Sequence, residues 1–363
     1  MTTPAPIAAA PPLPVDPRVA ATRKLLVVLA VLCVVMMILS VWWGTGQLKI
    51  SPVKAIDTLL NPDGASELAQ VSVDNRLSRV LMSFGVGVAL ATAGALLQTL
   101  YRNPLASPEI TGVSQGSIVA VVCYLVFAPD AVNQPVWVLP MVGSIGGLLA
   151  GLLTWAVTRL GGKIDPLRLI LTGVLLAGLL GSIVAIAIIS RTALSQDLVQ
   201  WTVGAIGTAT WERVGILYLG VLVATPIGIV SIPYANALGL GDDIGQGVGL
   251  NVGLARGLVL LSAAVLTASA VSLVGGIGFV GLVAPHLVRR VTGSDLRRLV
   301  PAAAMAGASL VAVADFASRN FRPNDIATHF GVPEEIARVT LPTGVYLALF
   351  GAPFFIHLLR RLP

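Results

Sequence analysis

Runs of about 20 apolar residues, each long enough to cross a bilayer's hydrocarbon core as a helix, recur along the chain and limit its possible folds more than any other feature. Of the 363 residues, 56% are hydrophobic and 11% are charged. Soluble domains carry about 25% charged residues. The sequence therefore predicts an all-α membrane protein.

Ten transmembrane helices are predicted. Single-helix runs cover 25–43, 79–101, 110–128, 136–158, 167–189, 213–233, 301–318 and 339–359. The run 257–287 is too long for one helix, and it has a cation at each end, Arg256 and Arg289. Because cations favour the cytoplasmic side, this run is expected to cross twice. Its second crossing, 276–288, is short and must be buried among helices or covered by loops that enter the membrane.

An even number of crossings places both termini on one side, and 14 of the 23 Lys and Arg residues fall in the segments that this topology makes cytoplasmic. Both termini are therefore expected in the cytoplasm. Residues 1–24, rich in Pro and Ala, are predicted to be a disordered tail. Residues 25–361 are predicted to form one transmembrane domain. Small residues such as Gly143 and Gly147 are expected at close helix contacts.

A polar interval at 234–256, YANALGLGDDIGQGVGLNVGLAR, separates two long apolar stretches. On one helix its regularly spaced glycines would share a face: Gly241, Gly245, Gly249, Gly253 and Gly257. Asp242 and Asp243 suit a helix N-terminus. We interpret the interval as a structured loop that docks on a separate soluble motor subunit; an ordinary solvated loop is the alternative.

Several other chemistries are disfavoured. Gly276, Gly278 and Gly281 spell G-x-G-x-x-G, but in an apolar span without a βαβ unit, and there is no Walker A sequence. The chain is therefore not expected to be an enzyme or to bind a cofactor. The net charge of +6 is not gathered in basic patches, which argues against nucleic acid.

Metal and disulfide chemistry are also disfavoured. The histidines His286, His329 and His357 lack ligand spacing, and Cys33 and Cys123 lie in apolar runs. His286 is instead expected to hydrogen-bond free carbonyls at a helix C-terminus. Ion-coupled transporters usually carry ionisable groups inside the membrane, but here Asp315 lies near one end of its span. This favours an external energy source over a secondary transporter or a channel.

Several sequence blocks resemble the FecCD-type permeases of type II ABC importers. They are RLSR at 76–79, Gly94 with Gln98, RNPLASP at 102–108, TGVSQG at 111–116, GFVGLVAPH at 278–286 with Arg289, the interval 315–319, LPTG at 341–344 and GAPFF at 351–355. The resemblance extends over about 76–361. It implies a type II ABC importer permease fold with ten spans.

The same resemblance implies partners and a cargo. The partners are a second permease, identical or paralogous, two ATPase subunits that bind ATP and Mg, and an extracytoplasmic substrate-binding protein. The assembly would lie in a bacterial cytoplasmic membrane. The cargo is an iron chelate, with a ferric siderophore favoured over haem or cobalamin. The ATPase-coupling residues would be Leu240, Gly241, Asp242, Asp243, Gly245 and Gly249.

Three external cations have a proposed role on the same basis. Arg76, Arg79 and Arg319 fall on the external side of the ten-span topology, against the positive-inside tendency. The resemblance implies that they hold the substrate-binding protein. The alternative is that they pair with Asp74 or Asp315, or reach lipid headgroups.

Overall fold

The computed structural model describes residues 17–43, 51–61, 64, 66–128, 134–160, 166–190, 195–207, 209–247, 249–321 and 341–359, and within these ranges the regular elements are all helices. The helices are α1 (Pro17–Trp42), α2 (Pro52–Leu60), α3 (Glu67–Leu100), η2 (Pro108–Thr111), α4 (Val113–Phe127), α5 (Val138–Leu160), α6 (Pro166–Ser190), α7 (Ser195–Val203), α8 (Trp211–Leu240), α9 (Asp242–Gly247), α10 (Val252–Val274), α11 (Val280–Thr292), α12 (Leu296–Asn320) and α15 (Thr343–Leu359).

Each of the ten predicted spans corresponds to a helix, so the predicted all-α membrane fold is confirmed. Among the described residues, seven helices are long and apolar enough to cross a bilayer: α1, α3, α5, α6, α8, α10 and α12. The other three, α4, α11 and α15, are shorter. The chain is therefore a multi-pass membrane protein.

Several predicted boundaries differ from the structure; α8, for example, ends at Leu240 and not at 233, and α12 begins at Leu296 and not at 301. The second span was expected to begin at residue 79, but α3 begins at Glu67 and runs for 34 residues. The predicted disordered tail, 1–24, overlaps α1, which begins at Pro17; residues 1–16 lie outside the described residues. In α3 the polar residues before the apolar run do not end the helix, because this segment packs against neighbours, with Ala69, Val73 and Arg76 buried. The start of α1 is mostly exposed and begins with Pro17, a residue that suits the first helical turn.

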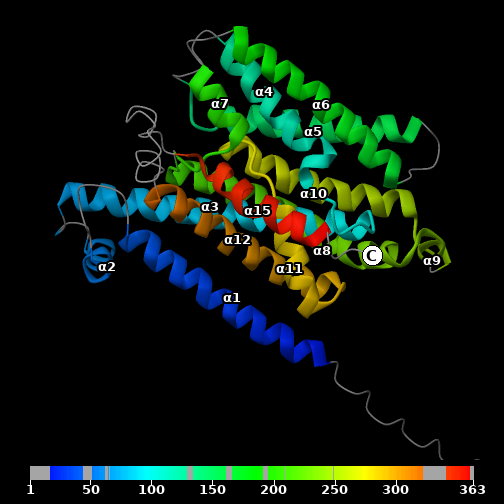
Figure 1. Cartoon of the computed structure of the whole chain (residues 1–363), viewed down its shortest axis with the longest axis horizontal. Helices are drawn as coiled ribbons and strands as arrows, with labels where there is room; N and C mark the ends of the chain where they lie inside the picture. The colour runs from blue at the N-terminus through cyan, green and yellow to red at the C-terminus, as the bar shows by residue number, and fades with distance from the viewer. Residues whose placement is uncertain are drawn as a thin grey trace, which may run out of the picture.

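Helix α3 is the centre of the bundle, with α8, α10, α11 and α12 packed around it (Figure 1). Of its most apolar 18-residue window, 78% is buried. Glycines permit the closest approaches: a Cβ built on Gly87 would lie 2.2 Å from the carbonyl oxygen of Gly307 in α12, and one on Gly94 would lie 1.9 Å from that of Gly281 in α11. Such backbone contact is how small residues hold helices together in lipid.

Helices α4, α5 and α6 lie to one side of α3, and α1 lies on the opposite side (Figure 1). The expected close contacts at Gly143 and Gly147 are confirmed. A Cβ on Gly143 would lie 2.7 Å from Cβ of Ser272 in α10, and one on Gly147 would lie 2.3 Å from Oγ of Ser117 in α4. Helix α5 thus joins the α4–α6 group to the rest of the bundle through α10.

The short crossing is α11, which begins after five non-helical residues, 275–279. Backbone groups around its entrance are paired with the last turn of α7 and the segment that follows it. The amide of Gly276 donates to the carbonyl of Trp201, and the amide of Ala205 donates to that of Val274. A covering loop therefore satisfies backbone groups that lipid could not, as expected for a half-length crossing.

The bundle has two ends, which we call the α2 end and the α9 end (Figure 1). Helix α1 begins at the α9 end, where Arg18 approaches Gly293. Helix α15 begins at the α2 end, where Thr343 contacts Asp315, and therefore runs toward the α9 end. The start of α1 and the end of α15 thus share a side, as an even number of crossings requires.

Candidate functional site

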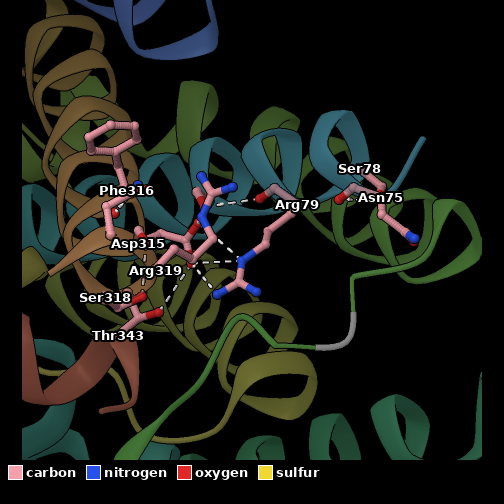
Figure 2. Close-up of polar contacts among 10 residues, drawn as sticks. Asn75, Ser78, Arg79, Asp315, Phe316, Ser318, Arg319 and Thr343 are labelled. Atoms are coloured by element: carbon pink, nitrogen blue, oxygen red, sulfur yellow. Dashed lines mark hydrogen bonds and ion pairs between the residues drawn. The ribbon is translucent and has the colours of Figure 1, made fainter. Parts of the chain in front are cut away.

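A buried ion-pair network lies near the α2 end, where α3, α12 and α15 meet (Figure 2). Arg79 donates from Nε and Nη2 to Oδ1 of Asp315, at 3.0 Å and 2.9 Å. Nε of Arg319 lies 3.2 Å from Oδ2 of the same carboxylate. Thr343 adds a hydroxyl donor to Oδ1 at 3.3 Å. The Asp315 side chain is only 1% exposed, so one buried carboxylate joins three helices.

The register of two helices explains why these residues meet. Gly87 of α3 touches Gly307 of α12, and the two helices run in opposite directions. Arg79 lies eight residues before the first glycine, and Asp315 lies eight residues after the second. Because the helices are antiparallel, this glycine contact places Arg79 and Asp315 at the same height along the bundle. Arg319 follows Asp315 by one helical turn, the spacing at which side chains on one face meet.

The expectation that Arg76, Arg79 and Arg319 face outward is only partly met. Arg76 is 7% exposed and donates to the carbonyl oxygen of Val41 at 2.9 Å, and Arg319 is 8% exposed. The side chain of Arg79 is 23% exposed. Arg79 and Arg319 pair with Asp315 in this structure, as the alternative interpretation expects. Docking of a substrate-binding protein at these arginines stays a prediction.

The predicted glycine face at 234–256 is wrong. Helix α8 ends at Leu240, Gly241 has φ 132°, α9 covers Asp242–Gly247, and Gly249 has φ 82°. Positive φ at two of the glycines breaks the chain into a helix, a short helix and another helix, so the five glycines do not share a face. The expected acids in the first turn are confirmed, since α9 begins with Asp242 and Asp243.

The end of α8 and the short helix α9 present apolar side chains outward. Leu240 is 70% exposed and Ile244 is 50% exposed, at the tip of the loop between α8 and α10. Gly245 is buried on the opposite side, where a Cβ would lie 3.6 Å from Cδ2 of Leu238, an ordinary contact. The loop therefore combines a packed inner side with an exposed apolar tip.

Asp242 connects this loop to the transmembrane helices. Nη2 of Arg256, in α10, donates to Oδ2 of Asp242 at 2.6 Å, and Nη2 of Arg102 lies 3.8 Å from Oδ1. Arg102 follows α3 directly and has φ 51°, a left-handed conformation that non-glycine residues rarely adopt. The α9 segment is thus held by cations from two different helices.

Gln98, for which the sequence predicted no role, joins α3 to α11. Nε2 of Gln98 donates to the carbonyls of Gly281 and Leu282 at 3.3 Å and 3.1 Å, and Oε1 accepts from Nη2 of Arg289 at 3.1 Å. These carbonyls lie in the first turns of α11, after the segment 275–279. Gln98 therefore fixes the depth and rotation of the short crossing against α3.

The prediction for His286 is wrong. Its Nδ1 is buried without a hydrogen-bond partner, and its ring packs edge to face on Phe354 at 6.4 Å between centroids. Among the described residues no group of three or more His, Cys, Asp or Glu side chains could hold a metal ion. Cys33 and Cys123 are both free thiols.

Comparison with known proteins agrees with this architecture. The profile of the FecCD transport family matches residues 31–361. The permease protein YfmE of a Bacillus subtilis Fe(3+)-citrate import system is 33% identical, over 92% of this chain and 94% of that protein. The Yersinia pestis hemin transport permease HmuU is 32% identical, over 84% of this chain and 87% of that protein. A solved structure of a metal-chelate type ABC transporter, inward-facing, has a TM-score of 0.74 at 26% identity, covering 94% of this chain and 100% of that one.

Proposed function

The chain belongs to the FecCD transport family, and from that premise we propose that it is the permease subunit of an ATP-driven importer of an iron chelate. The observation that supports this most directly is the loop between α8 and α10. It exposes Leu240, at the end of α8, and Ile244, on the short helix α9, which Asp242 ties to the transmembrane bundle. A surface of this kind suits a soluble subunit that pushes on the bundle.

The proposed cargo follows from the relatives. They are named for ferric citrate, hydroxamate, hemin and cobalamin, all metal chelates. A ferric siderophore is the cargo that we favour, and haem or cobalamin is the alternative. The cargo carries its own iron, so no resident metal site in this chain is needed.

The proposed assembly contains two permease subunits, identical or paralogous, in a bacterial cytoplasmic membrane. Two ATPase subunits would bind ATP and Mg and dock on the α9 end. A substrate-binding protein would deliver the chelate at the α2 end. ATP-driven closure of the motor would shift the permease pair between outward-open and inward-open states.

Within this scheme Arg79 is the docking residue best placed to meet the binding protein first, because it is the most exposed of the three arginines. Acidic residues of the binding protein would compete with Asp315 for its guanidinium. Docking of this type should weaken as salt screens the charges, with a Debye length of about 8 Å at physiological ionic strength.

Transport in the reconstituted system is expected to require ATP and no ion gradient. The measurement is uptake of a ferric siderophore into proteoliposomes that contain the chain, its co-encoded ATPase and its binding protein, with ATP on the motor side. The matched control is an ATPase whose Walker A lysine is replaced, which should abolish uptake. Uptake that continues with this control and collapses with an ionophore would restore the secondary-transporter alternative.

Replacing Asp242 with asparagine is expected to lower substrate-stimulated ATP hydrolysis fivefold or more, because couplings between sites are typically worth about 1–3 kcal/mol. The change removes the anion that Arg102 and Arg256 share and frees α9 from α3 and α10. Asp57→Asn, an exposed change in α2, is the control and should leave hydrolysis unchanged. Normal stimulation in the Asp242 variant would show that the ion pair does not transmit the motor's movement.

A further inference from the structure

A cavity of about 370 Å³ lies between α5, α6 and α10, with Leu97 of α3 also in its wall. Its lining is almost entirely apolar and includes Leu152, Trp155, Leu169 and Leu261. The two threonines in the wall have used their hydroxyls: Thr154 donates to the carbonyls of Thr111 and Ala150, and Thr111 donates to that of Pro108. The cavity therefore suits hydrocarbon rather than a polar ligand.

The depth of the cavity places it in one leaflet. On α10, which begins at Val252, the lining runs from Gly257 to Ala264. At 1.5 Å per residue this is roughly 8–18 Å from the start of the helix, at the α9 end. Leu152 and Leu261 are more than one-third exposed, so the cavity opens toward the surface of the bundle.

Two cations lie next to residues of the cavity wall. The guanidinium carbon of Arg159, in the last turn of α5, is 5.1 Å from the ring centroid of Trp155, which lines the cavity. Arg168, in the first turn of α6, precedes Leu169, which also lines it. Both arginines are exposed, and within the described ranges no carboxylate forms a salt bridge to Arg159. Basic sites between helices on the cytoplasmic side are typical receptors for anionic lipid headgroups.

We propose that this cavity binds one acyl chain of an anionic phospholipid from the cytoplasmic leaflet, with the lipid phosphate between Arg159 and Arg168. The apolar wall takes the chain, and the two cations next to it select the charged headgroup. Gly257 in the wall directly follows Arg256, which holds Asp242, so the lipid packs beside the start of the helix that anchors α9. The inference depends on the chain's position in a membrane and not on which substrate it carries.

The test uses the purified full chain in vesicles that contain increasing fractions of brominated-chain phosphatidylglycerol or brominated-chain phosphatidylcholine. Bromine on an acyl chain in the cavity quenches Trp155, and the Trp155 component is obtained by subtracting the signal of a Trp155→Phe variant. We expect half-quenching at a fraction of phosphatidylglycerol at least about fivefold lower than that of phosphatidylcholine, since each cation near an anionic surface contributes about that factor.

Two variants decide the outcome. Arg159→Gln with Arg168→Gln, both at exposed positions, should abolish the preference for phosphatidylglycerol. Ala264→Phe, which fills the cavity, should abolish quenching of the Trp155 component, whereas Leu149→Phe, on an exposed part of α5 outside the lining, should not. An unchanged preference in the double arginine variant would overturn the proposal. So would a Trp155 component that neither lipid quenches in the natural chain, the result expected if a second copy of the chain covers the cavity.

Discussion

Replacing Asp315 with alanine is expected to destabilise the folded chain by about 3–5 kcal/mol, the range measured when one partner of a buried ion pair is removed. The carboxylate is 1% exposed, accepts hydrogen bonds from Arg79 and Thr343, and forms an ion pair with Arg319. Without it, the guanidinium of Arg319 is left buried with no anion, and α3, α12 and α15 lose the group that joins them. The measurement is unfolding of the purified chain in detergent micelles, followed by helical circular dichroism.

The control for this prediction is Asp74→Ala, the same change at an exposed position of α3, which should alter the free energy of unfolding by less than about 0.5 kcal/mol. Combining Asp315→Ala with Arg319→Met should recover part of the loss, because it removes a buried charge that has lost its partner. Equal stability of the Asp315 and Asp74 variants would mean that the network does not hold the three helices together.

The number and kind of helices could be predicted from the sequence because the bilayer sets the length of a span. Apolar runs of that length, with cations near their ends, located all ten crossings, including the short α11 within the run 257–287. The starts of α1 and α3 could not be predicted in this way. Both helices begin several residues before the apolar run does, in segments whose polar residues carry no apolar signal.

The coupling loop shows where spacing alone fails. A glycine every four residues from Gly241 to Gly257 is compatible with one face of a helix. It is equally compatible with a segment that turns at its glycines. In the structure the chain turns at Gly241 and Gly249, both with positive φ. The pair Asp242 and Asp243 was the more reliable signal, because acids at a helix N-terminus have an electrostatic reason to be there.

The charge network could be guessed from the sequence only as an alternative. Pairing of Arg79 with Asp315 joins residues 236 positions apart and depends on the register of α3 against α12. That register is set by contact between Gly87 and Gly307, which are two among 38 glycines. Sequence spacing indicates which glycines can share a helix face, but not which glycine of another helix they meet.

The close approach of α3 and α11 leads to a second substitution with a large expected effect. Gly94→Ala should cost more than about 3 kcal/mol, beyond the usual 1–3 kcal/mol for overpacking, because the new methyl group would lie 1.9 Å from the carbonyl oxygen of Gly281. A side chain could turn away from such a clash, but a backbone carbonyl cannot. Helix α11 must then move as a unit, and Gln98 loses its bonds to the carbonyls of Gly281 and Leu282.

Gly178→Ala is the matched control, since it makes the same change within a transmembrane helix at a position where a Cβ meets nothing within 4 Å. There the added methyl group should be neutral or slightly stabilising, because alanine favours a helix over glycine by about 1 kcal/mol. Both variants would be compared by the yield of monodisperse protein in detergent and by its unfolding temperature. A Gly94→Ala chain as stable as the Gly178→Ala chain would show that α3 and α11 do not meet through their backbones, and the placement of the half-length crossing would then be wrong.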